Sequence, residues 1–128
     1  MRVLLDTHAL IWAVDDPTHL GADARRVIED HSTELRISAA TVWEIAIKTG
    51  PGKLTSSMTY LEWMNRAVAD LGATILPITV EYANAQASLP RHHRDPFDRM
   101  LIAQAQSEDM HLAANEEIFD RSGIKRLS

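Results

Sequence analysis

The chain has 128 residues, of which 45 % are hydrophobic and 24 % charged, values typical of a globular protein with one sizeable core. Its net charge of −5 argues against a protein that holds nucleic acid by bulk attraction alone, although cations in an acidic pocket would reverse the local sign. Cysteine is absent, and we recognise neither a membrane span nor a signal peptide. These features predict a cytoplasmic protein without disulfides, thiolate metal sites or membrane association.

The first predicted element is a strand, Val3 to Leu5, whose unbroken apolar run is typical of a strand buried on both faces in a parallel sheet. It ends at Asp6 and Thr7, and a helical pattern follows over 9–14. Ligands of open α/β sheets gather outside the carboxyl ends of the strands, which makes Asp6 a candidate functional residue. The alternative is that Asp6 only caps the following helix.

The second candidate residue is Glu44, in a predicted helix over 39–48 for which Ser38 is the expected N-cap. This helix follows a turn, a short amphipathic helix and a second strand, predicted over 15–18, 24–29 and 35–37. Apolar residues surround Glu44 on the helical wheel, so we expect the helix to be buried. A buried carboxylate is costly unless it is paired or binds a metal, and the alternative is a salt bridge to Lys48.

The second half of the chain continues the alternation of helices and strands. Its predicted elements are a loop over 54–57, a helix over 58–71 that Gly72 ends, a strand over 74–77, a helix over 78–89, a polar loop over 90–94, a helix opening at 95 and running to 105, a strand over 110–114 and a last strand over 124–127. Such alternation predicts one α/β domain over 1–128, with a parallel sheet and right-handed crossovers. Neither repeats nor a linker indicate a second domain.

Four acidic residues recur at comparable places in these units: Asp6, Glu44, Asp98 and Glu116. Sheet topology could bring them to one end, where two carboxylates about 5 Å apart would repel by roughly 3 kcal/mol at an effective dielectric constant of about 20. Either several stay protonated or a divalent cation lies among them. Oxygen ligands favour Mg²⁺ or Mn²⁺ over zinc.

Three segments carry a family resemblance: Leu4 to Leu10 (LLDTHAL), Ser38 to Ala46 (SAATVWEIA) and His93 to Arg99 (HRDPFDR). They resemble the corresponding segments of PIN domains, and more closely those of VapC-type toxins. The resemblance implies a three-layer fold with a central, mostly parallel sheet flanked by helices. It also implies a Mg²⁺- or Mn²⁺-dependent endoribonuclease that hydrolyses RNA phosphodiester bonds, forms a homodimer and is inhibited by a VapB-like antitoxin.

The acidic positions of the family carry over to Asp6, Glu44 and Asp98 as catalytic metal ligands. Asp95 is a rival for the third position, but the family pattern places the acid immediately before the apolar part of the helix, which favours Asp98. Counting back from Phe119 assigns the fourth position to Glu116.

The fourth position departs from the family pattern, which commonly has Asp preceded two residues earlier by Thr or Ser. Glu116 keeps the charge on a longer arm, whereas Ala114 lacks the hydroxyl that would orient a ligand or water. If the strand geometry persists as far as Asn115 and Glu116, these neighbours point to different sides, and only one of them can face Asp6. The departure leaves an alternative function, a PIN-like binding module with weakened catalysis that acts through its antitoxin complex.

Other side chains have both a structural and a functional interpretation. His8 is interpreted as structural rather than as an RNA contact. The basic stretch from Arg91 to Arg94 is either a solvated loop or a phosphate-binding segment before Asp98. Trp12, Trp43 and Trp63 lie at apolar helical positions, where core or interface packing is favoured over stacking on bases.

Overall fold

A computed structural model describes residues 1–52, 58–90 and 94–128 of the chain, with a parallel sheet at its centre. The described strands are β1 (Arg2–Leu5), β2 (Glu34–Ser38), β3 (Thr74–Leu76), β4 (His111–Ala113) and β5 (Arg126–Leu127). Their order is β3-β2-β1-β4-β5, and every pairing is parallel. The prediction of a mostly parallel sheet is therefore confirmed.

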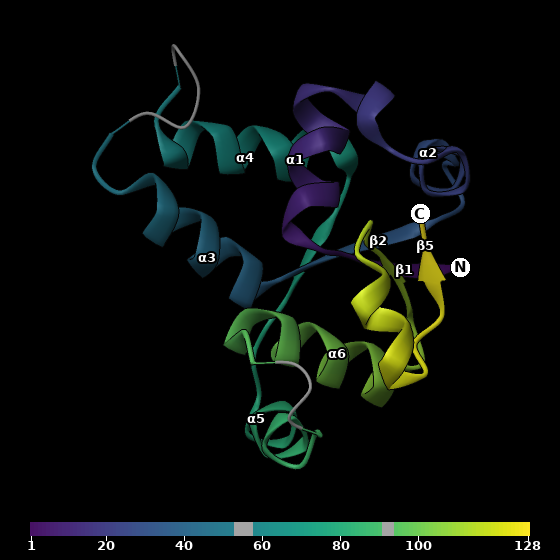
Figure 1. Ribbon diagram of the computed structural model, residues 1–128. Coiled ribbons are helices and arrows are strands. Elements are labelled where there is room, and N and C mark those ends of the chain that lie inside the picture. Colours follow the sequence, from purple (N-terminus) through teal and green to yellow (C-terminus); the bar gives the residue numbers. More distant parts are fainter. Residues whose placement is uncertain (53–57, 91–93) are drawn as a thin grey trace.

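Helices cover both faces of this sheet, which gives the expected three layers (Figure 1). The helices are α1 (Thr7–Asp15), α2 (Ala22–Glu29), α3 (Ala39–Thr49), α4 (Tyr60–Leu71), α5 (Val80–Ala87) and α6 (Pro96–Glu108), with short 3₁₀ helices η1 (Pro17–His19) and η2 (Glu117–Ser122). Helices α5 and α6 lie together on one side, and α1 and α4 lie on the other (Figure 1). Among the described residues, no helix is long and apolar enough to cross a membrane.

The side chains of β1 explain the two helical layers. Val3 and Leu5 belong to the core cluster that includes Leu10 of α1 and Trp63 of α4, whereas Leu4 belongs to the cluster beneath α6. All three strand residues are fully buried, as the unbroken apolar run predicted. Because successive side chains of a strand point to opposite faces, three residues anchor both layers.

Local capping signals were predicted correctly from the sequence. The side chain of Ser38 accepts a hydrogen bond from the backbone N–H of Ala40 and begins α3. Gly72 ends α4 with φ of 60°, a left-handed conformation that glycine adopts without steric cost. Helix α4 begins only at Tyr60 because Thr59 is its N-cap, two residues later than the periodicity predicted.

The expectation that α3 is buried is correct for one face of the helix only. Its inner face buries Ala40, Thr41, Glu44 and Ile45, but Trp43 and Ile47 on the opposite face are 62 % and 55 % exposed. The helical wheel counts apolar residues and cannot tell which face meets the sheet. Trp63 is buried in the core as predicted, whereas Trp43 is not a core residue. The loop predicted over 54–57 lies outside the described residues.

Candidate active site

The sheet topology brings the four predicted acids toward one edge. Strands β2, β1 and β4 are parallel neighbours, and Leu5 at the end of β1 pairs with Ile37 and Ala113. Asp6 directly follows β1, Glu44 lies on the helix that follows β2, and Glu116 follows β4. Asp98 joins them from the first turn of α6, which also contacts α3. The carboxyl ends of parallel strands meet at one edge, which explains why positions far apart in sequence converge.

Asp6 caps α1, as the alternative interpretation predicted, and it also belongs to the group of Asp6, Glu44, Asp98 and Glu116, which we call the acidic cluster. Its Oδ1 accepts a hydrogen bond of 2.7 Å from the backbone N–H of Ala9, so Asp6 is the N-cap of α1. The residue is only 4 % exposed. Burial raises the pKa of the Asp6 carboxyl to about 6, although the hydrogen bond from Ala9 opposes the rise. An ordinary helix cap has no such penalty, because it is solvated.

Glu44 is buried, and both of its oxygens accept hydrogen bonds. The hydroxyl of Thr7 donates to Oε1 over 2.5 Å, and the ammonium of Lys48 donates to Oε2 over 2.7 Å. The salt bridge to Lys48, the alternative interpretation of Glu44, is therefore present. Thr7 is a contact that the sequence did not reveal, and its only signal was a hydroxyl residue next to Asp6. The hydrogen bond fixes the orientation of Glu44 from a neighbouring helix.

Asp98 and Asp95 have distinct roles in the structure. The exposed Asp95 caps α6, and its Oδ1 accepts hydrogen bonds from the backbone N–H groups of Phe97 and Asp98. Asp98 is half-buried, and burial, followed by the negative charges of Asp95, Glu116, Glu44 and Asp6, raises its pKa to about 7. The negative charges of the other three predicted acids therefore act on the Asp98 carboxyl. The choice of Asp98 over Asp95 as the third metal ligand stays a prediction.

Glu116 is the most exposed of the four acids. Its Oε1 lies 3.8 Å from Nδ1 of His8, and its negative charge contributes to the raised pKa of both Asp6 and Asp98. Asn115 instead lines a small cavity beside Ala9 and Trp12, at the junction of α1 and α2. The two neighbours thus lie in different surroundings. Strand alternation does not explain this difference, because β4 ends at Ala113, before either residue. The role of Glu116 as fourth metal ligand stays a prediction.

The donor chemistry of this edge fits a hard divalent cation. Carboxylate oxygens are the ligands that Mg²⁺ and Mn²⁺ prefer. Burial, with a contribution from neighbouring negative charges, raises the pKa values of Asp6 and Asp98, and a bound cation would favour their ionised forms. Within the described ranges, no group of three or more acidic or histidine side chains is arranged to hold one ion. Glu44 faces Thr7 and Lys48, so its binding to a cation there requires a change of partner.

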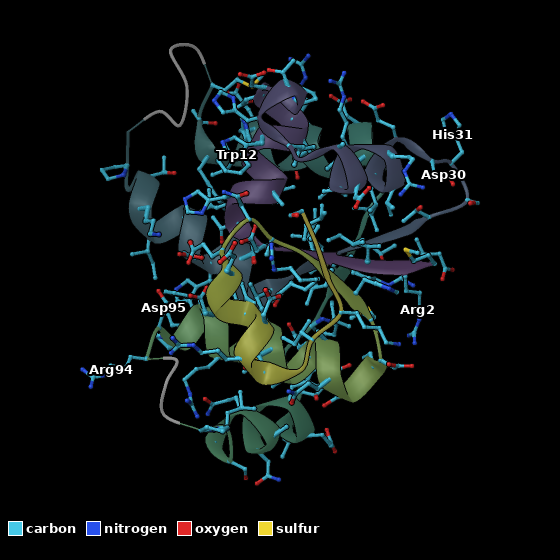
Figure 2. The ribbon with its side chains drawn as sticks, turned by 45° about the vertical axis from the view of Figure 1, so that its right-hand side comes forward. Arg2, Trp12, Asp30, His31, Arg94 and Asp95 are labelled. Carbon is cyan, nitrogen blue, oxygen red and sulfur yellow. The ribbon has the colours of Figure 1, made fainter. Side chains whose placement is uncertain are left out.

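Residues outside the acidic cluster have less definite surroundings. The exposed His8 lies 5.7 Å from Trp12 between ring centroids, beside the same edge. Arg94 is exposed next to Asp95 and extends away from the body of the protein (Figure 2). Arg91, His92 and His93, the rest of the predicted phosphate-binding stretch, lie outside the described residues. A role of this stretch in RNA binding stays a prediction.

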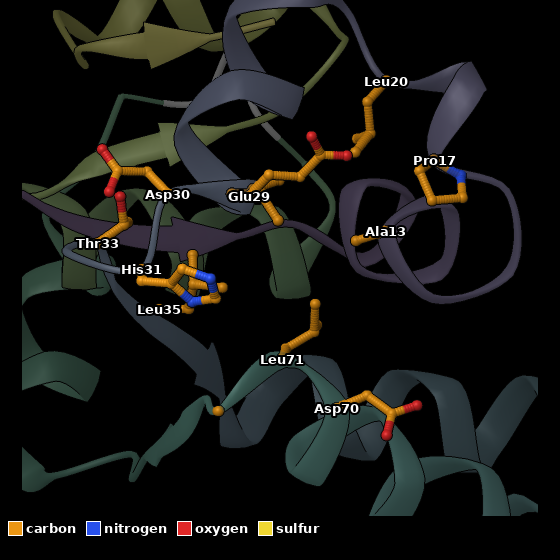
Figure 3. A pocket seen from close by; sticks show the side chains of 12 residues that line it. Ala13, Pro17, Leu20, Glu29, Asp30, His31, Thr33, Leu35, Asp70 and Leu71 are labelled. Carbon is orange, nitrogen blue, oxygen red and sulfur yellow. The ribbon is translucent and has the colours of Figure 1, made fainter.

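The opposite edge of the sheet, which we call the amino edge, has a cavity of about 390 Å³ near the amino ends of β2 and β3. Leu35 and Leu71 line it together with acidic side chains, among them Glu29, Asp30 and Asp70 (Figure 3). Each of these acids has a partner at the surface: Arg25 for Glu29, Ser32 for Asp30 and Arg66 for Asp70. The acids of this cavity therefore have partners close to them in sequence. At the edge where the carboxyl ends of the strands meet, which we call the carboxyl edge, burial raises the pKa of Asp6 and Asp98.

A family model for the PIN domain matches residues 3–125 of the chain. The chain belongs to the PIN domain family. A curated relative, Ribonuclease VapC22 of Mycobacterium tuberculosis, is 31 % identical over 104 residues, which cover 80 % of this chain and 78 % of that protein. The resemblance predicted from the three sequence segments is thus confirmed at the level of the PIN domain.

Solved structures share the fold of this PIN domain at low sequence identity. The complex VapBC2 of Rickettsia felis, bound to a promoter DNA fragment, matches with a TM-score of 0.76 and 14 % identity, over 99 % of this chain and 98 % of that one. DNA-bound VapBC of Salmonella typhimurium matches with a TM-score of 0.70 and 20 % identity, over 99 % and 97 % of the two chains. These similarities confirm the predicted PIN-like three-layer fold.

Proposed function

We propose that this PIN domain is a divalent-metal-dependent endoribonuclease and the toxin component of a type II toxin–antitoxin pair. The observation that carries the proposal is the raised pKa of Asp6 and Asp98, which share one edge of the sheet with Glu44 and Glu116. Perturbed acids gathered in one place are typical of sites that bind cations or transfer protons. The 31 % identity to a protein named as a ribonuclease supports RNA as the substrate.

Each acidic residue has a defined task in this proposal. Asp6 provides a carboxylate directly after β1, where the backbone N–H of Ala9 holds it. Glu44 provides a second carboxylate from α3, where the hydroxyl of Thr7 orients it. Asp98 adds a third from α6, and Glu116 approaches from the solvent side. When bound, Mg²⁺ or Mn²⁺ would activate water and stabilise the leaving oxygen of the phosphodiester. The protein side chains hold the cation and keep the reacting groups in place.

The proposed partners are RNA, a VapB-like antitoxin and a second copy of the chain. The solved structures of the same fold include VapBC complexes, which supports an antitoxin. The acidic edge would accept a basic side chain of such a partner in place of a cation. The exposed apolar side chains of Trp43 and Ile47 on α3 offer a surface that dimer formation would bury. Light scattering of the chain, alone and co-expressed with a candidate VapB-like antitoxin, would report both assemblies.

A test of the enzymatic proposal compares RNA cleavage by the wild-type chain and by Asp6→Asn. We expect cleavage by the wild type only when Mg²⁺ or Mn²⁺ is supplied, and none by the variant. Asparagine retains the helix cap and the shape of the side chain but removes the charge. Circular dichroism checks that both proteins are folded. Cleavage at the parental rate by Asp6→Asn, or equal cleavage in a chelator, would contradict the assignment.

The alternative function, a PIN-like binding module, is favoured by two features of the fourth position. Ala114 is buried without a hydroxyl, and the Glu116 side chain is 53 % exposed. A binding module would form the antitoxin complex but leave RNA intact under every metal condition. Three acids with buried or half-buried side chains favour the enzyme, because a chain without catalysis has no need to keep these costly groups.

A further inference from the structure

The contact between Lys48 and Glu44 joins an exposed cation to a buried anion. The Lys48 side chain is 66 % exposed and the Glu44 side chain 8 %, and their charged atoms are 2.7 Å apart. The hydrogen bond to Glu44, together with the negative charges of Glu44, Asp95 and Asp98, raises the pKa of the Lys48 ammonium. The ammonium thus lies in the field of the carboxylates to which a metal role is assigned above.

The two oxygens of Glu44 are not equivalent. Oε1 accepts a hydrogen bond from Thr7, whose residue is itself buried at the start of α1. Oε2 is held by Lys48, which is anchored one helical turn later on α3 and extends into solvent. A cation that used Oε2 would approach to about 2.1 Å, where it would meet the ammonium on the same oxygen. Two positive charges at that distance repel each other, which favours the departure of one of them.

We propose that Lys48 is a positioning residue that occupies Glu44 as a tethered cation and competes with the divalent ion for it. This inference rests on the proposed function. The lysine pairs with the buried carboxylate and orients it, and its exposed, flexible arm allows it to withdraw when the divalent ion arrives. The exchange lowers the affinity for metal and at the same time protects a buried charge from being left without a partner.

The inference predicts that removal of the ammonium strengthens metal binding. Manganese binding to the full chain can be measured by electron paramagnetic resonance of free Mn²⁺ for the wild type, Lys48→Met and Lys48→Arg. We expect a roughly fivefold lower Kd in Lys48→Met, the size typical of an ion pair with one exposed partner. Lys48→Arg should retain the parental Kd. Lys125→Met is the matched control, because Lys125 forms an ion pair of 3.0 Å with Asp109 outside the acidic cluster.

The outcomes separate this inference from the proposed function. A lower Kd in Lys48→Met alone supports the exchange. An unchanged or higher Kd in Lys48→Met, with normal binding by the wild type, overturns the role of Lys48 and leaves the metal site intact. Absence of Mn²⁺ binding in wild type and variant alike overturns both. As a second readout, the Lys48 ammonium resonance in ¹⁵N nuclear magnetic resonance should shift on titration with Mg²⁺, and an unshifted resonance at saturating Mg²⁺ also counts against exchange.

Discussion

Acidic side chains gather at two edges of the sheet, and the pKa values of Asp6 and Asp98 at one edge move in the opposite direction to that of Asp30 at the other. At the carboxyl edge, burial raises the pKa of Asp6 to about 6 and that of Asp98 to about 7. At the amino edge, hydrogen bonds from the backbone and the hydroxyl of Ser32 lower the pKa of Asp30. Asp95 and Asp30, near the respective edges, lie at opposite sides of the molecule (Figure 2).

The two edges differ both in cavity volume and in the surroundings of their acidic side chains. The amino edge has the 390 Å³ cavity, but its acids are solvated and paired with neighbours in sequence. The carboxyl edge combines acids from four separate segments, and burial raises the pKa of two of them, Asp6 and Asp98, toward neutral pH. Such perturbed carboxyl groups are typical of sites that bind cations or transfer protons, which is the basis of the function proposed above.

The largest expected effect distinguishes the two edges by activity. Asp98→Asn should reduce the rate of metal-dependent RNA cleavage by about 10²–10³-fold, because it removes a charge placed to stabilise the reacting groups. Asp70→Asn, at the rim of the amino-edge cavity, should leave the rate unchanged within about twofold. Initial rates on a fluorescent single-stranded RNA would measure both. Similar losses in the two variants would remove the functional distinction between the edges.

The pH dependence of stability should also differ in sign between the edges. Asp6 has a folded-state pKa of about 6 against 3.8 in the unfolded chain, so its ionisation disfavours folding as pH rises through this interval. The rise corresponds to about 3 kcal/mol. In a chelator at pH 7.5, Asp6→Asn should therefore be more stable to urea than the wild type. At pH 4 the two should be nearly equal, because the Asp6 carboxyl is then protonated in the folded protein.

The pH dependence of stability that Asp30 contributes has the opposite sign to that of Asp6. Its lowered pKa contributes stability that is present above pH 3.8 and is lost as pH falls through the folded-state value. Asp30→Asn should therefore be slightly less stable than the wild type at pH 7.5 and equal to it in strong acid. If Asp6→Asn behaved like Asp30→Asn, the Asp6 carboxylate would be stabilised in the folded chain, contrary to its burial.

The sequence predicted the parts of this molecule that depend on neighbours in the chain. The apolar run Val3 to Leu5 and the cap at Ser38 located β1 and the start of α3, and the i+4 spacing suggested the pair of Glu44 and Lys48. The hydrogen bond from Thr7 to Glu44 spans 37 positions and depends on how α1 and α3 pack, so local patterns could not reveal it. The sequence predicted core or interface packing for Trp43, and its exposed position likewise depends on how α3 packs.

The smallest expected effect concerns the fourth acid at the carboxyl edge. Glu116→Gln should weaken Mn²⁺ binding or cleavage by a few-fold, because Glu116 is exposed and contributes mainly through its charge. Asn115→Ala should change neither quantity, since Asn115 lines the cavity between α1 and α2. Cleavage assays across a manganese titration compare the two variants directly. Loss of activity in Asn115→Ala with a normal Glu116→Gln would shift the fourth position by one residue.

Proton release on metal binding is the measurement that tests the role of the carboxyl edge most directly. At pH 6.5, Asp98 and part of the Asp6 population are protonated, so a cation bound by these carboxylates must displace protons. Titration calorimetry with Mn²⁺ in buffers of different ionisation enthalpy should report release of about one proton per chain. Asp6→Asn and Asp98→Asn should lose the binding. Binding without proton release, or unchanged binding in both variants, would contradict a metal site at this edge.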